Sequence, residues 1–196
     1  MATWQSRGLR GDTFEEMINV TLDHYRSQKL ALIQKIPTPI KPIDIDKETR
    51  HITLAYFDQK STVDYIGAVQ GIPVCFDAKE CQETSFPLKN IHEHQMEFMK
   101  DFEEQGGVSF FLIHYTSLDR IYYVPYTTVV PFWERALRKE RMSFTLEELL
   151  HEVYYEVPLR KAVYVHFLEA LADDIERRDA LAEHVENKNE KTVDKP

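Results

Sequence analysis

The segment Val108–Ile113 limits the possible folds more than any other, because every residue in it except Ser109 is apolar. A strand that is apolar along almost its whole length must be covered on both faces, as in a buried sheet. Apolar residues at helical spacing predict helices over residues 13–33 and 91–104, which are candidates to cover it.

The remaining patterns place this strand in a larger domain. Further strands are predicted at residues 63–66, 72–79 and 121–124, and a helical pattern with breaks near Ser143 and Pro158 covers residues 129–175. Capping boxes fit the starts of the first two helices, formed by Asp12 with Glu15 and by Asn90 with Glu93. This order predicts an α/β domain with a mixed central sheet flanked by helices.

The composition excludes several classes of protein. The chain has 196 residues, of which 43% are hydrophobic, and this indicates a folded domain. A formal net charge of −9 excludes a general basic surface, so a nucleic-acid role requires local patches or a bound metal. Cys75 and Cys81 do not form a zinc-like pair. Neither a membrane span nor a secretory signal is visible, so we expect a cytoplasmic protein without membrane contact.

Three prolines, Pro37, Pro39 and Pro42, precede two strand patterns at residues 43–45 and 52–57. Proline disfavours both a helix and a central strand, so we predict a β-hairpin that projects from the body. The predicted organisation is one domain over residues 1–175 with this insertion at about 37–57. A charge-rich tail over residues 176–196 is predicted to be disordered.

Charged residues on two neighbouring strands form the main chemical pattern. Side chains alternate along a strand, so Asp77 and Lys79 share one face while Ala78 faces the other way. Asp64 lies on the preceding strand across the Gly67–Gly71 turn, and strand pairing would bring it to the same place. Two carboxylates and a backbone carbonyl are hard oxygen ligands that suit Mg²⁺ or Mn²⁺. Lys79 beside such a metal can stabilise a phosphoryl transition state.

Each of these residues also has a simpler interpretation. Asp64, Asp77 and Lys79 fit an exposed strand face with an incidental ion pair, and Glu15 fits the preference of helix starts for acids. Gln95 is the polar member of an otherwise apolar helix face, so it needs a carboxylate, a metal-bound water or the backbone as partner. His92 and His94 are interpreted as surface or capping residues, and Cys75 as packing.

Three motifs resemble the RecU-type Holliday-junction resolvases, a family with the restriction-endonuclease-like PD-(D/E)xK nuclease fold. These motifs are Ser61-Thr62-Val63-Asp64-Tyr65-Ile66-Gly67, Phe76-Asp77-Ala78-Lys79-Glu80 and the run from Thr84-Ser85-Phe86-Pro87 to His92-Glu93-His94-Gln95. The resemblance implies a metal site formed by Thr62, Asp64, Asp77 and Gln95. It further implies that Lys79 stabilises the transition state and that Glu15 is a catalytic carboxylate near the site.

The resemblance also implies a substrate and partners. The hairpin would be the family's stalk, which inserts at the junction centre, and Lys47, Arg50 and Arg7 would contact DNA. The expected activity is a Mg²⁺-dependent (or Mn²⁺-dependent) endonuclease that cuts four-way junctions by paired symmetric nicks during recombination and repair. A homodimer is expected, as is association with the bacterial nucleoid and with a recombinase or branch-migration helicase.

Two departures from the family pattern leave alternatives open. Asp77 stands where the family usually has Glu, and the Arg7-Gly8 pair lies close to the start of the chain, where family members often have a long basic arm. With the acidic net charge, this predicts weaker DNA affinity. The alternatives are a junction-binding or remodelling protein with weak or no nuclease activity, and a nuclease of the same fold for another DNA structure.

Overall fold

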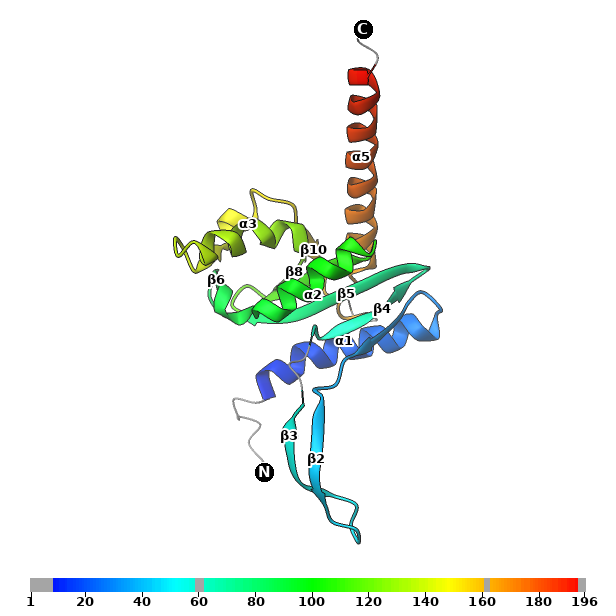
Figure 1. Ribbon diagram of the computed structural model, residues 1–196, viewed down its shortest axis with the longest axis vertical. Helices are drawn as coiled ribbons and strands as arrows, with labels where there is room; N and C mark the ends of the chain where they lie inside the picture. Colours follow the sequence, from blue (N-terminus) through cyan, green and yellow to red (C-terminus); the bar gives the residue numbers. More distant parts are fainter. Residues whose placement is uncertain (1–8, 59–61, 161–162, 194–196) are drawn as a thin grey trace.

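The computed structural model describes residues 9–58, 62–160 and 163–193 and is built around a six-stranded sheet (Figure 1). The strand order is β1-β4-β5-β7-β8-β10, with β2-β3 and β6-β9 as separate pairs. The elements are α1 (Leu9–Ser27), β1 (Leu32–Lys35), β2 (Ile40–Ile45), β3 (Ile52–Phe57), β4 (Tyr65–Val69), β5 (Ile72–Cys81), β6 (Ser85–Pro87), η1 (Leu88–Asn90), α2 (Glu93–Glu104), β7 (Val108–Tyr115), β8 (Arg120–Pro125), α3 (Tyr126–Leu137), β9 (Ser143–Thr145), α4 (Leu146–Leu149), β10 (Tyr155–Val157) and α5 (Leu168–Val193).

The central sheet is mixed, as predicted. Strands β5 and β7 are parallel, while the other neighbours in the sheet pair antiparallel. Strand β7 lies in the middle and is buried along its length except at His114. The apolar run at Val108–Ile113 therefore occupies the covered position that its composition requires.

Helices cover both faces of the sheet and create two cores. Helices α1 and α5 pack on one face, where Phe76 stacks between Tyr65 and Phe110 with ring centroids 4.6 and 4.8 Å apart. Helices α2 and α3 pack on the other face, against the side of β5 that carries Cys75 (Figure 1). The predicted α/β domain with a helix-flanked mixed sheet is confirmed.

The first helix was predicted over residues 13–33 and differs from the structure at both ends. Helix α1 begins at Leu9, so Asp12 lies inside it and is not its cap. The helix ends at Ser27, and strand β1 begins at Leu32, within the segment that was predicted to be helical up to residue 33. Lys29 has a positive φ of 57°, which ends the helix. A Cβ on Gly67 would lie 2.1 Å from the carbonyl oxygen of Leu32, so only glycine lets β1 approach β4 this closely.

The predicted cap of the second helix was also wrong. Asn90 ends the short helix η1, and His92 is the residue that caps α2. The side-chain Oε1 of Gln95 accepts a hydrogen bond of 2.9 Å from the backbone N–H of His92. The start of α2 is therefore tied to Gln95 and not to Glu93.

The C-terminal third differs most from the prediction. The helical pattern at residues 129–175 contains strands β9 and β10 in addition to helices, and α5 continues through the segment predicted to be disordered, to Val193. Helix α5 contains neither glycine nor proline, so nothing in its sequence interrupts it. Its base is held by the buried Asp174, which bonds Tyr123 and Arg178, and by an ion pair between Arg178 and Glu103. None of the helices in the described part of the chain is long and apolar enough to span a membrane.

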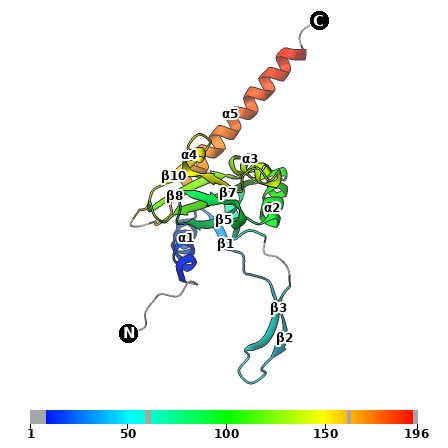
Figure 2. The ribbon, with the colours of Figure 1, turned by 90° about the vertical axis from the view of Figure 1, so that its left-hand side faces the viewer.

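The predicted hairpin is present and projects from the body at the end opposite to α5 (Figure 2). Its strands β2 and β3 pair with each other and with no strand of the central sheet. Asp46 orders the tip, because its Oδ1 accepts hydrogen bonds from the backbone N–H groups of Glu48 and Thr49 at 2.8 and 3.2 Å. Both faces of the pair are exposed.

Candidate active site

Strand pairing brings Asp64 and Asp77 into direct contact. Tyr65 of β4 lies opposite Phe76 of β5, so the residues just before and just after them meet at one end of the strand pair. The backbone N–H of Asp64 donates to Oδ1 of Asp77 at 3.0 Å, and the N–H of Ala78 donates to Oδ2 of Asp64 at 3.1 Å. The predicted convergence of the two carboxylates on this strand pair is confirmed.

Asp77 is fully buried, and its negative charge is well satisfied. Nε2 of Gln95 donates to both of its carboxylate oxygens, at 3.0 and 2.9 Å. Nζ of Lys79 forms an ion pair with Oδ2 of the same carboxylate. A buried carboxylate persists only with such partners, so the incidental surface pair considered from the sequence does not describe this site.

Asp64 lies beside this arrangement and is less well compensated. Burial, together with the smaller effect of the neighbouring negative charge of Asp77, raises the pKa of its carboxyl to about 7. Lys79 and the N–H of Ala78 oppose the rise but do not cancel it. One buried and one half-buried carboxylate with a single lysine therefore leave a place where an added cation is favourable.

Gln95 reaches this site from the first turn of α2. The helix carries it on the face that packs on β5, where Met96 and Met99 are also buried. Its Oε1 is occupied by the N–H of His92, and its amide N–H₂ group faces Asp77. Of the partners that the sequence left open for Gln95, the structure shows two, the backbone at His92 and the carboxylate of Asp77.

Thr62 and Glu15 are less closely connected to the pair of carboxylates. Thr62 is half-buried two residues before Asp64 and makes no hydrogen bond to another described residue. Glu15 lies on α1, on the opposite face of the sheet, and forms an ion pair with Lys35. The hydroxyl of Tyr65 lies 3.5 Å from the backbone carbonyl oxygen of Glu15, so α1 contacts the strand that follows Asp64.

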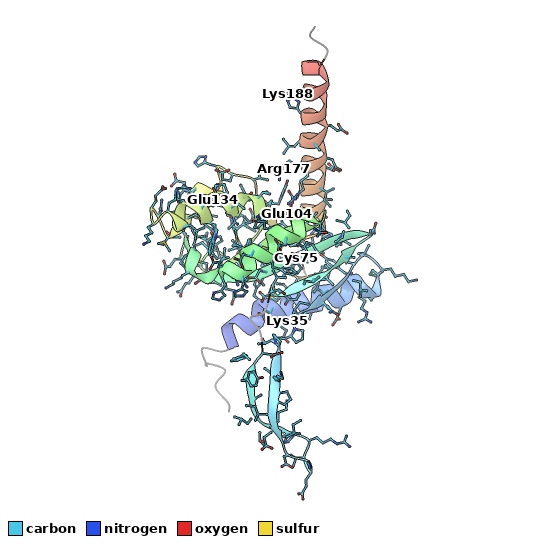
Figure 3. All side chains as sticks on the ribbon, viewed as in Figure 1. Lys35, Cys75, Glu104, Glu134, Arg177 and Lys188 are labelled. Carbon is cyan, nitrogen blue, oxygen red and sulfur yellow. The ribbon has the colours of Figure 1, made fainter. Side chains whose placement is uncertain are left out.

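Lys35 was missed by the sequence analysis. It ends strand β1 opposite Tyr65, at the point where the hairpin leaves the body (Figure 3). The predicted helix ended at Ile33 and the predicted hairpin began at Pro37, so Lys35 was assigned to neither element and its position beside Glu15 was not predicted. The proline at residue 37 was the available signal, since the residues before a proline favour an extended chain.

The predicted DNA contacts and the remaining polar residues are placed as follows. Lys47 and Arg50 are exposed at the tip of the hairpin, whereas Arg7 lies outside the described residues. The rings of His92 and His94 stack with centroids 5.3 Å apart. Within the described ranges, no group of three or more His, Cys, Asp and Glu side chains is arranged to hold a metal. The two aspartates would therefore need other oxygen donors to complete a metal site.

Comparison with known proteins gives one consistent result. The family described as "RecU: Recombination protein U" matches residues 9–173. The Holliday junction resolvase RecU of Staphylococcus carnosus is 39% identical over 168 residues, which are 84% of this chain and 80% of that protein. The protein of the same name from Leuconostoc mesenteroides is 42% identical over 141 residues, or 70% of this chain and 69% of the relative.

A solved structure was also found. The Holliday junction resolvase Hjc of Archaeoglobus fulgidus aligns with a TM-score of 0.45 and 8% sequence identity, covering 72% of this chain and 91% of the other. The family assignment rests on the sequence matches, which extend from the start of α1 to the base of α5. The chain belongs to the Recombination protein U family.

Proposed function

We propose that this protein is a metal-dependent, structure-selective DNA endonuclease that resolves Holliday junctions by paired symmetric nicks during recombination and repair. The observation that carries the proposal is the contact between the half-buried Asp64 and the buried Asp77, with Lys79 and Gln95 on the oxygens of Asp77. Relatives that are about two-fifths identical over most of the chain are named Holliday junction resolvases. Its proposed place of action is the nucleoid in the bacterial cytoplasm.

The residues at the site fit a divalent cation. The raised pKa of Asp64 indicates a carboxylate that lacks enough positive charge, and Asp64, Asp77 and the carbonyl of Ala78 would be the oxygen donors. We propose Mg²⁺, with Mn²⁺ as a substitute. When bound, such an ion supplies Lewis-acid activation of water and neutralises charge on the phosphate. Thr62 and Gln95 are proposed as further donors, and Gln95 already fixes the orientation of Asp77.

Lys79 is proposed to stabilise the transition state. Its side chain is 15% exposed, so its charge is only partly screened by water, and its ammonium group is fixed on Asp77. A lysine held there can move its hydrogen bonds to a phosphate oxygen as negative charge develops. Asp77 keeps the ammonium group in position, and Gln95 keeps Asp77 in position.

We propose a homodimer as the active form. Symmetric incision of a four-way junction requires two sites, which a two-fold dimer provides. The hairpin exposes seven large apolar side chains, and exposed apolar surface of this extent marks an interaction surface. These residues are Ile40, Ile43, Ile45, Ile52, Leu54, Tyr56 and Phe57. Lys47 and Arg50 at its tip would meet the phosphates at the junction centre.

A cleavage comparison tests the proposal. The protein is incubated with a mobile four-way junction, a linear duplex, a flap and a nicked duplex, each with Mg²⁺, with Mn²⁺ or with chelator. Paired symmetric nicks in the junction that require the metal are expected. Preferential cutting of the flap or nicked duplex would favour a nuclease for another DNA structure. Tight junction binding without cutting would favour a remodelling protein.

Sedimentation that shows a monomer both free and on junction DNA would disprove the dimer.

A further inference from the structure

A small apolar groove lies on the α3 side of the molecule, away from the two carboxylates. It is formed by helix η1 and the end of α3 together with the loop after it, and has a volume of about 110 Å³. Leu88, Ile91, Ala136 and Trp133 form its inner part, while Leu137 and Met142 stand at its edge. Glu134, labelled in Figure 3, marks the position of α3 beside it.

The walls of the groove are fixed by the fold. Strand β6, which leads into η1, pairs with β9, which follows the α3 loop. The backbone N–H of Leu88 donates to the carbonyl oxygen of Met142 at 2.9 Å, which joins the two walls directly. A groove that is built into two paired strands in this way needs little reorganisation to accept a partner.

The apolar surface at the groove is unusually open. Leu137 is 61% exposed and Met142 is 60% exposed, although both adjoin the buried side chains of Leu88 and Ile91. The volume is well below the roughly 300–1,000 Å³ of pockets that hold small molecules. A single large apolar side chain from a partner is the occupant that matches this size.

Positive charge surrounds the groove in a chain whose net charge is −9. Residues 133–142 contain four basic side chains, Arg135, Arg138, Lys139 and Arg141, and two acidic ones, Glu134 and Glu140. Arg135 and Arg141 pair with Glu148, and Arg138 pairs with Glu140. Lys89, which lines the groove, and Lys139 have no carboxylate partner among the described residues. Glu134 likewise has no basic partner among them, but the five basic side chains named here outnumber the acidic Glu134, Glu140 and Glu148, so the net charge around the groove is positive.

We propose that this groove docks an acidic peptide segment of another protein, with one large apolar side chain of that segment inserted between Met142, Trp133 and Leu88. The acidic residues of the segment pair with Lys89 and Lys139. An apolar pocket with a charged rim is the arrangement in which one buried side chain supplies most of the affinity and the surrounding charges supply orientation. The proposal does not depend on the catalytic role of the carboxylates.

The occupant would lie beside the start of α2, the helix that carries Gln95. Ile91 lines the groove, and the next residue, His92, is bonded to Gln95, which contacts Asp77. A DNA strand fits the groove less well, because six of its seven lining residues are apolar and Lys89 is the one cation that lines it. A second copy of this chain is also a poorer occupant, since the exposed apolar residues of the hairpin form a separate and larger surface.

Fluorescence gives a direct test with the full chain. The sequence has two tryptophans, so a Trp4→Phe variant leaves Trp133 in the groove as the sole reporter. A labelled short peptide rich in Asp and Glu with a single Phe should bind with micromolar affinity and change the emission of Trp133. Replacing its Phe by Ser should weaken binding by at least about tenfold. Leu137→Glu should do the same, and Lys89→Glu should weaken binding by about three- to tenfold.

Leu181→Glu is the matched control, because Leu181 is 54% exposed but lies on α5. It should leave peptide affinity unchanged. The proposal would be overturned if the Phe and Ser peptides bound with equal affinity, or if the Leu137→Glu variant bound the Phe peptide as tightly as the parent protein. Either result would mean that charge alone holds the peptide. Complete displacement of the peptide by a DNA duplex would assign the groove to DNA. A lower sedimentation coefficient for Leu137→Glu would assign it to a second copy of the chain.

Discussion

The central sheet and the hairpin are both built from strands, but they obtain their stability in different ways. Strand β7 is buried at every residue except His114, and neighbouring strands and helices from both faces hold it. In the hairpin every residue of β2 is exposed, as is every residue of β3 except Ala55. Isolated two-stranded hairpins are marginally stable in water, so this one depends on its local turn and on whatever contacts it.

Because of this difference, we expect the residues for cleavage to lie in the central sheet and the residues for DNA recognition to lie in the hairpin. The carboxylates lie where β4 and β5 pair, and hydrogen bonds from the backbone of Asp64 and from Gln95 fix the buried Asp77. The hairpin carries its charges at an exposed tip and can be changed without disturbing that site. We therefore expect substitutions in the sheet to affect cleavage and substitutions in the hairpin to affect the choice of DNA.

The largest expected effect is the loss of cleavage on Asp77→Asn. The amide keeps the shape of the side chain but lacks the negative charge that would hold a metal and that holds Lys79. Junction cleavage should fall by roughly a thousandfold or more, which corresponds to about 4 kcal/mol of transition-state stabilisation. Junction binding should be nearly unchanged, because phosphate contacts elsewhere supply it. Wild-type turnover of the variant at saturating Mg²⁺ would disprove the assignment of the site.

Lys79→Ala should lower cleavage by about a hundredfold, since it removes one charge that stabilises the transition state. Metal binding measured by calorimetry should persist, because both carboxylates remain. Lys100→Ala is the matched control, as Lys100 forms a surface pair with Glu104, and it should leave cleavage unchanged. Loss of metal binding in the Lys79 variant would show instead that the lysine only organises the carboxylates.

Replacement of residues 41–52 by a short Gly-Ser turn tests the hairpin. The affinity for a four-way junction relative to a linear duplex should fall by about tenfold, or about 1.4 kcal/mol, because Lys47 and Arg50 are removed. The melting temperature should change little, since these strands pair only with each other. Unfolding of the variant would mean that the hairpin is part of the core. Unchanged junction preference would place recognition in the body.

The sequence predicted the parts of the site that depend on local pairing. Asp64, Asp77 and Lys79 were found because a short turn and the alternation of side chains determine which residues meet across a hairpin. Gln95 was found as a polar residue on an apolar helix face, since burial of an amide requires partners.

The sequence did not predict the parts that depend on contacts between distant segments. Strand β1 is short and exposed at three of its four residues, so only its pairing with β4 defines it. The ion pair of Lys35 with Glu15 depends on that pairing and was missed with it. The cap of α2 was misplaced by two residues because η1 intervenes, and η1 is held by a backbone bond between Leu88 and Met142.

The smallest expected effect is a gain in stability on Asp64→Asn, and it depends on pH. The pKa of Asp64 is raised to about 7 in the folded protein, above the ordinary value of 3.8. The folded state therefore retains a proton that the unfolded state releases above about pH 4. The free energy of unfolding of the wild type should fall as the pH rises from about 4 to 7 and should level off above that. The amide imitates the neutral form and avoids this loss.

Thermal melts in the presence of chelator at several pH values measure this difference. The variant should be more stable than the wild type by about 1 kcal/mol at pH 8, and the gain should vanish below about pH 3, where Asp64 of the wild type is protonated in both states. Added Mg²⁺ should stabilise the wild type at pH 8 and reduce the gap, because a ligand that binds only the folded state raises its stability. A gain of equal size at both pH values would show that the substitution acts through packing and that Asp64 is not an undercompensated carboxylate.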